Sequence, residues 1–175
     1  MSFQESKKTI VLIFSILVLG ILLDQVTKYL AVQYLMNHPP HYFFNGMFQL
    51  VYAENPGAFL GMGGQMSRPV RFLIFGVFVL GGLLFMLWMM VKNKMPLKEI
   101  YAYSLIISGG FGNVIDRLFH DNGHVVDFLF IDLKFHPLAR TGVFNVADML
   151  IVLGFLIILP SVFKSSKEDG HVQSN

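Results

Sequence analysis

One uninterrupted run of apolar residues, Phe72 to Val91, limits the possible folds of this chain more than any other feature. It contains 20 residues and no charge. A helix of about 20 residues is as long as the hydrocarbon core of a bilayer is thick, about 30 Å. Of the 175 residues, 54% are hydrophobic and only 14% are charged, too few charges to cover the surface of a soluble domain. We therefore expect an integral membrane protein.

A second apolar run, residues 10–23, lies near the amino terminus and is shorter. It reaches the length of a membrane span only if its helix continues through Asp24 and Lys28. Lys7 and Lys8 before the run also resemble the start of a secretory signal peptide. However, no small-x-small cleavage site follows, and Asp24 comes directly after the run. We interpret the segment as a retained helix.

Two more apolar runs, 100–115 and 146–163, complete a set of four predicted spans. We place all of residues 1–175 in a single membrane-embedded domain, because the chain is too short for a separate soluble module. The predicted spans are about 10–30, 70–91, 98–118 and 144–163, and the predicted outer loops are about 31–69 and 119–143.

The distribution of basic residues predicts the orientation of these spans. Seven basic residues lie in three short segments that share one side of a four-span protein: Lys7, Lys8, Lys92, Lys94, Lys98, Lys164 and Lys167. Because short cytoplasmic segments are enriched in lysine and arginine, we expect both termini in the cytoplasm and the two long loops outside. The net charge of +2 gives no indication of a nucleic-acid partner.

The predicted outer loops are more than linkers. Residues 41–60 mix aromatic and β-branched residues with turn formers, which indicates short strands or a re-entrant platform. Residues 120–142 again alternate apolar and polar side chains. The expected fold is an all-α integral membrane protein with four transmembrane helices and a small extracytoplasmic platform of strands and loops.

Charged residues at the margins of the spans are the first candidates for function, because charges are costly there. Asp24 and Lys28 are spaced i, i+4 and can pair on one helix face, which favours a structural role. Asn113, Asp116 and Arg117 share one face of the third predicted helix. This trio could form a structural Asp–Arg interaction or a clamp for a substrate.

Asp148 opens the fourth predicted span, three residues after Asn145. This spacing is typical of a capping box, and a helix N-terminus also favours a negative charge. Considered alone, Asp148 is therefore best explained as part of a cap. If it is instead one of two catalytic carboxyl groups, its partner could be Asp116, Asp121 or Asp127. Asp127 differs in being flanked by apolar residues, which leaves a carboxylate poorly solvated.

The residue types predict neither a metal site nor an organic cofactor. The chain has no cysteine, which excludes disulfides, thiolate catalysis and cysteine-ligated metal. Its six histidines do not combine with an acid in the helical motif of zinc peptidases.

Five short stretches occur in order along residues 10–163: Asp24–Lys28, Glu54–Phe59, Gly109–Arg117, Val125–Phe128 and Phe144–Asp148. In this order they resemble the bacterial lipoprotein signal peptidases, also called signal peptidase II or prolipoprotein signal peptidases. One stretch departs from the usual family pattern: Asn55-Pro-Gly-Ala-Phe-Leu stands where many members have Asn-x-Gly-Ala-Ala-Phe.

The resemblance implies an aspartic endopeptidase of the bacterial cytoplasmic (inner) membrane with its active site at the outer face. It would remove signal peptides from prolipoproteins by cleaving just before a diacylglyceryl-modified cysteine, without a cofactor. The implied partners are these precursors and membrane lipids, the implied state is a monomer, and no nucleic acid is expected. The implied catalytic pair is Asp127 and Asp148. The motifs also assign substrate contact or support of the pair to Asn55, Asn113, Arg117 and Asn145, and structural roles to Asp24, Lys28 and Asp116.

Two other classes of protein fit the residues without the resemblance. Acids in a small membrane protein can mark the path of a proton- or ion-coupled transporter. Here, however, they cluster at one face, and the chain shows no internal repeat of the kind many transporters have. The other alternative is a non-enzymatic assembly subunit whose polar pairs only stabilise packing.

Overall fold

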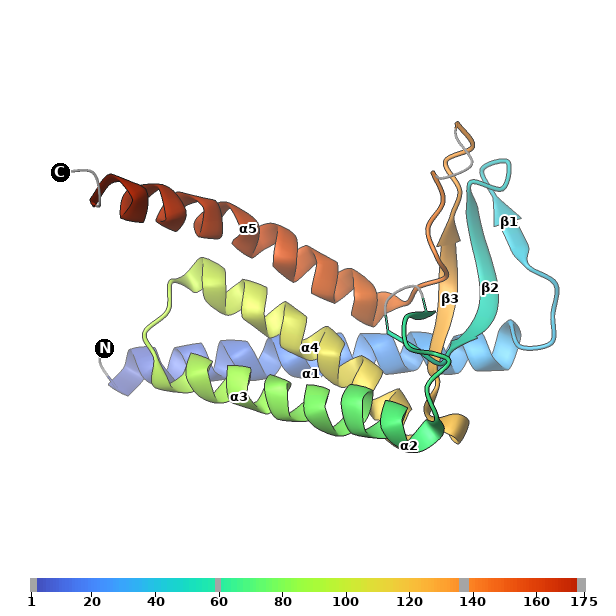
Figure 1. The fold of residues 1–175 in the computed structure, drawn as a ribbon, viewed down its shortest axis with the longest axis horizontal. Helices are drawn as coiled ribbons and strands as arrows, with labels where there is room; N and C mark the ends of the chain where they lie inside the picture. The colour runs from blue at the N-terminus through green and yellow to red at the C-terminus, as the bar shows by residue number, and fades with distance from the viewer. Residues whose placement is uncertain (1–2, 59–60, 136–138, 173–175) are drawn as a thin grey trace.

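Five α-helices and a short π-helical segment between α2 and α3 account for most of the described residues. The computed structural model describes residues 3–58, 61–135 and 139–172. The helical elements are α1 (Phe3–Tyr34), α2 (Arg68–Arg71), the π-helix η2 (Phe72–Phe78), α3 (Val79–Lys92), α4 (Leu97–Phe119) and α5 (Val146–Val172). In Figure 1 the long helices extend from the sheet towards the end of the molecule that holds both termini.

The helices agree with the predicted spans in position, but only two of them are long and apolar enough to be identified as spans by composition. These are Lys7–Tyr34 and Arg68–Lys92, the second of which combines α2, η2 and α3. The apolar part of α5, Val146–Pro160, is shorter than a typical span. α4 carries charged and amide side chains near both of its ends. The first two predicted spans are therefore supported, and the third and fourth remain predictions.

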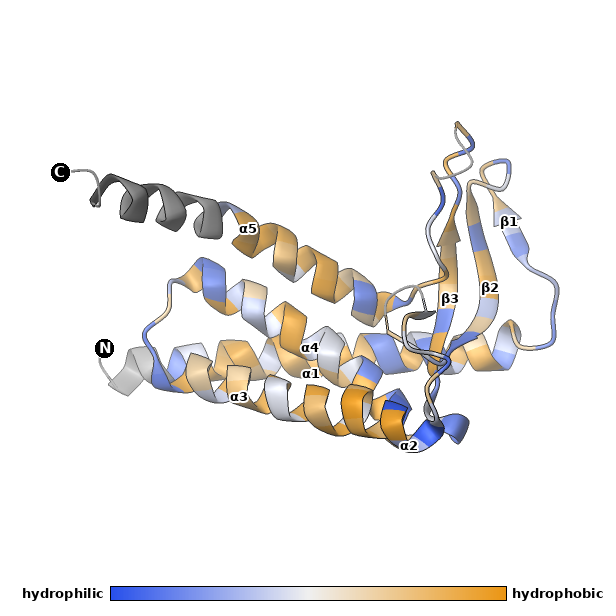
Figure 2. Cartoon of the chain, in the orientation of Figure 1, coloured by the Kyte–Doolittle hydropathy of each residue, from blue (hydrophilic) through white to orange (hydrophobic). Residues whose placement is uncertain are grey.

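Compared with a water-soluble protein, this one exposes many large apolar side chains and buries several polar ones. Large apolar side chains such as Phe14, Leu19 and Phe78 are more than 60% exposed on the outside. The buried polar side chains are Asp24, Lys28, Ser104, Ser108, Asp116, Asp127 and Asn145. Figure 2 shows mainly apolar colours along α3 and the coloured part of α5, and mixed colours in the sheet. An apolar exterior around an interior that holds several charged and amide side chains suits contact with lipid.

Glycines of α4 bring its neighbours close to its axis. A methyl group on Gly109 would lie 2.3 Å from the backbone oxygen of Ala147 in α5. One on Gly110 would lie 2.6 Å from Leu83 of α3, and one on Gly112 would lie 2.5 Å from a carboxylate oxygen of Asp24 in α1. The glycines of α4 therefore allow close packing, and α4 contacts all three long neighbours.

A three-stranded antiparallel sheet forms the platform, in the order β1 (His41–Phe43), β2 (Phe48–Asn55) and β3 (Val125–Ile131). The sheet confirms the strands predicted in the outer loops. β2 and β3 pair from Asn55 opposite Val125 to Phe48 opposite Ile131, with an irregularity between Leu50 and Ala53. The sheet packs on the end of α1 through a small apolar cluster of Ala31, Leu35, Val126 and Phe128.

Candidate active site

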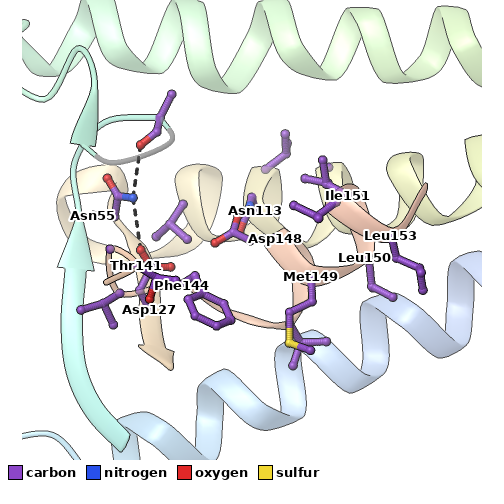
Figure 3. A pocket seen from close by; sticks show the side chains of 18 of the residues that line it. Asn55, Asn113, Asp127, Thr141, Phe144, Asp148, Met149, Leu150, Ile151 and Leu153 are labelled. Carbon is purple, nitrogen blue, oxygen red and sulfur yellow. Dashed lines mark hydrogen bonds between the residues drawn. The ribbon is translucent and has the colours of Figure 1, made fainter. Parts of the chain in front are cut away.

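Asp127 lies in the middle of β3 and is almost completely buried, with 2% of its surface exposed. Its carboxylate accepts hydrogen bonds from the side-chain amides of Asn55 (3.1 Å) and Asn145 (2.7 Å). Figure 3 shows the first of these bonds. Burial, together with the nearby charge of Asp148, raises the pKa of Asp127 to about 7, although the two amide donors oppose the shift. This residue can hold a proton at neutral pH.

Asp148 takes part in the predicted capping box, which the structure confirms. Its backbone N–H donates to the Asn145 side-chain oxygen (2.9 Å), and its own Oδ2 accepts from the Asn145 backbone N–H (3.2 Å). The other carboxylate oxygen, Oδ1, accepts from the side-chain amide of Asn113 (2.9 Å). Capping therefore uses only one oxygen of Asp148 and fixes the direction of the carboxylate.

Asn145 connects the two acids. Its side-chain amide donates to Asp127, and its backbone N–H donates to Asp148. Asn145 thus links Asp148 to Asp127, and the two other candidate partners have different surroundings. Asp116 is engaged by Lys28 (3.0 Å), and Asp121 lies exposed on a short turn after α4.

Behind the two acids lies a buried ionic cluster, which we call the Lys28 cluster: Asp24, Lys28, Asn113 and Asp116. The Lys28 ammonium is 2.8 Å from Asp24, 3.0 Å from Asp116 and 3.0 Å from the Asn113 side-chain oxygen. The i, i+4 pair of Asp24 and Lys28 is therefore confirmed. Asp116, expected to interact with Arg117, makes its ion pair with Lys28 on another helix.

Arg117 contacts loops. Its guanidinium donates to the backbone oxygens of Gly57 and Gly123, and it lies 5.1 Å from the ring centre of Phe75. Gly57 belongs to the segment that follows Asn55, where the sequence departs from the usual family pattern. In this structure Arg117 thus connects α4 to that segment and to the turn before β3.

Sequence reasoning missed two groups of residues near the site. Gln25 donates to Asp24 (3.2 Å), Asp116 (3.0 Å) and the backbone oxygen of Gly112 (3.1 Å). Its position between Asp24 and Lys28 in the first motif was the available signal.

The second missed group surrounds Glu54, which accepts from Tyr52 (2.9 Å) and lies 3.0 Å from His124. Burial raises the pKa of Glu54, but the hydrogen bonds to His124 and Tyr52 bring it below its ordinary value. His120 and His124 are four residues apart, a spacing that the sequence analysis overlooked. They do not share a helix, because α4 ends before His120. Within the described residues, no three His, Cys, Asp or Glu side chains are grouped as metal ligands would be.

Both acids line a cavity of about 1110 Å³. Its polar end also includes Asn55, Asn113 and Arg117. The rest of the wall is mainly apolar and comes from η2, α3, α4, α5 and the segment 140–144, including Phe75, Val79, Val114, Val152, Leu153 and Leu156. Figure 3 shows Asp127 and Asp148 at one end and the α5 side chains extending away from them. The cavity can hold an apolar segment with a polar bond placed beside the acids.

A family model described as "Signal peptidase (SPase) II" matches residues 16–164. The chain belongs to the signal peptidase II family. It is 35% identical over 151 residues to the lipoprotein signal peptidase of Borreliella burgdorferi (strain ZS7), covering 84% of this chain and 86% of that protein. It is 41% identical over 140 residues to the one from Caldanaerobacter subterraneus subsp. tengcongensis, covering 79% and 86%.

Solved structures agree with this fold. A bacterial membrane enzyme determined by the in meso method at 2.3 Å resolution superposes with a TM-score of 0.73 at 24% identity, covering 89% of this chain and 90% of that one. A second such structure, at 1.9 Å resolution, also gives 0.73. Membership of the signal peptidase II family favours a protease over the transporter and the assembly subunit considered from the sequence.

Proposed function

We propose that this signal peptidase II is an aspartic endopeptidase that removes signal peptides from prolipoproteins just before the diacylglyceryl-modified cysteine. Family membership and the names of the relatives support the substrate class. One observation supports the aspartic mechanism: Asp127 and Asp148 line the same cavity and are joined by Asn145. Asn55 and Asn113 each hold one of these carboxylates and support the pair.

Two neighbouring carboxyl groups cannot both ionise easily, so the pair holds one proton. With its pKa near 7, buried Asp127 retains that proton, while the first turn of α5, where Asp148 lies, favours the negative charge. Asp148 takes a proton from water as the water oxygen attacks the scissile carbonyl carbon, and Asp127 gives its proton to the carbonyl oxygen. The C–N bond then breaks when the amine leaving group takes the proton held by Asp148. One hydroxyl of the intermediate returns its proton to Asp127 and becomes the carbonyl of the new carboxyl group, which restores the pair.

The same proposal covers the membrane setting. Four spans in the bacterial inner membrane, with both termini in the cytoplasm, would place the sheet and the acids at the outer face. The apolar wall along α5 then suits the apolar part of a signal peptide, and the polar end of the cavity receives the bond to be cut. Water reaches a site at this level, whereas it would not reach one in the hydrocarbon core.

The decisive experiment replaces each acid with asparagine. We expect Asp127→Asn and Asp148→Asn to lower processing of a lipidated precursor by about three orders of magnitude or more each, because asparagine can neither activate water nor exchange a proton. The double variant should lose little more, since residues that act as one unit are not additive.

Asp121→Asn and Asp132→Asn are the matched controls and should stay active. A folded Asp148→Asn enzyme that cuts at the ordinary rate would leave Asp148 only its capping role, whose loss costs about 1 kcal/mol of stability.

A further inference from the structure

The structure assigns to Lys28 a role beyond that of a structural ion pair: it is the positioning residue that holds Asp127 and Asp148 in place relative to each other. This inference rests on the proposed function of the two acids. Lys28 is 3% exposed and does not line the cavity, so it acts through its neighbours.

The two carboxylates of the Lys28 cluster accept hydrogen bonds from the backbone beside the two acids. Asp24 accepts from the backbone N–H of Ala147 (2.8 Å), the residue directly before Asp148. Asp116 accepts from the backbone N–H of Val126 (3.0 Å), the residue directly before Asp127. One ammonium group therefore joins two carboxylates, each of which fixes the backbone next to one acid.

Lys28 also fixes the orientation of the Asn113 side-chain amide. Its oxygen accepts from Lys28 (3.0 Å) and from Asn145 (3.1 Å). Because an ammonium group can only donate, the oxygen must face Lys28, and the NH₂ group must face Asp148. Without Lys28, Asn113 could rotate and present its oxygen to the Asp148 carboxylate. Lys28 thus also preserves the donor that Asp148 accepts from (2.9 Å).

Lys28 is also the cation that forms ion pairs with both Asp24 and Asp116. Gln25 bridges Asp24 and Asp116, but it is neutral. Loss of Lys28 leaves two buried carboxylates that repel each other, and β3 and α5 would separate with them. A misplacement of about 1 Å can lower the rate of a catalytic step about 100-fold.

The test compares two variants. Lys28→Met changes the net charge of the cluster, whereas Asp24→Asn/Lys28→Met keeps it at the wild-type value. For both we expect kcat on a lipidated precursor to fall about 100-fold, with KM within about threefold, because the apolar part of the cavity wall is untouched. Lys134→Met, on the exposed hairpin where Lys134 pairs with Asp132, is the charge control and should match the wild type.

A second control tests whether lower stability of the folded protein by itself reduces kcat. Ile13→Ala, a change at a buried position in the N-terminal half of α1, should lower the melting temperature. It should leave kcat near wild type at a temperature well below unfolding. If the charge-balanced variant recovers wild-type kcat, Lys28 only balances charge, and the inference is wrong. That result, together with inactive Asp127→Asn and Asp148→Asn enzymes, would leave the proposed function intact. Active asparagine variants would instead remove the proposed function itself.

Discussion

At the scale of single residues, the two acids differ in their surroundings although they share a cavity. Asp127 is buried in a strand among apolar neighbours and accepts from two side-chain amides. Asp148 stands in the first turn of a helix, where the backbone dipoles favour a negative charge. Environments that stabilise opposite protonation states divide acid and base work between two identical side chains.

The raised pKa of Asp127 predicts a pH-dependent stability. The folded state binds this proton more tightly than the unfolded chain does, so the free energy of unfolding falls as pH rises from the ordinary value of 3.8 to about 7. Asp127→Asn removes this penalty, which is at most about 4 kcal/mol. We expect the variant to gain stability relative to wild type between pH 5 and pH 8, measured by thermal unfolding in detergent. An equal difference at both pH values would mean that Asp127 is not buried as an acid.

Arg117 gives a second prediction at this scale. Its planar guanidinium reaches two backbone oxygens from two different nitrogens, a spread that the single nitrogen of a lysine lacks. We expect Arg117→Lys to lower kcat/KM by about tenfold, because the segment after Asn55 loses its attachment to α4. Processing of a lipidated precursor measures the effect. Wild-type activity would show that the charge suffices, or that the contact is not needed.

At the scale of elements, α4 decides how the molecule packs, because its glycines allow three helices to approach. Gly112 is the one that faces the Lys28 cluster: Asp24, which a methyl group there would strike, is fixed by both Lys28 and Ala147. The Lys28 cluster therefore depends on a position that has no side chain.

Gly112→Ala should lower the free energy of unfolding by about 1–3 kcal/mol and reduce activity, since Asp24 has to move. Gly81→Ala on α3 is the matched control, because a methyl group there meets nothing within 4 Å. This control should be neutral or slightly stabilising. Thermal unfolding and a processing assay separate the two variants; equal melting temperatures would contradict the packing argument.

What could be predicted from the sequence depended on how local the interaction is. The Asp24–Lys28 pair and the capping box of Asn145 and Asp148 follow from spacing along one helix, and both are present. The partnership of Lys28 with Asp116 could not be predicted, because it depends on how α1 packs against α4. For the same reason the residues alone left Asp116, Asp121 and Asp127 equal as partners of Asp148, and only the family resemblance chose Asp127.

In the sheet, too, local features could be predicted from the sequence and long-range pairing could not. Strand-forming composition in the outer loops predicted strands, but the pairing of β2 with β3 joins segments about 75 residues apart and contains an irregularity. Gln25 and Glu54 were missed because their partners lie on other elements.

At the scale of the whole molecule, orientation in the membrane is the open prediction. Because the chain has no cysteine, single cysteines can be introduced and labelled one at a time. A cysteine near Lys94 should be protected from an impermeant reagent in intact cells, and one near Asp132 should react. Labelling of the site near Lys94 would reverse the orientation and place the acids on the cytoplasmic side.

The apolar cavity wall along α5 has a consequence for how the enzyme meets its substrate. Met149, Val152, Leu153 and Leu156 line the cavity and are each about half exposed. For an enzyme set in a bilayer, that exposure faces lipid, so a precursor can arrive by lateral diffusion without ever leaving the membrane. Turnover would then follow the number of precursors per lipid molecule, and adding inert detergent or lipid would slow the reaction by dilution in two dimensions at constant bulk concentration.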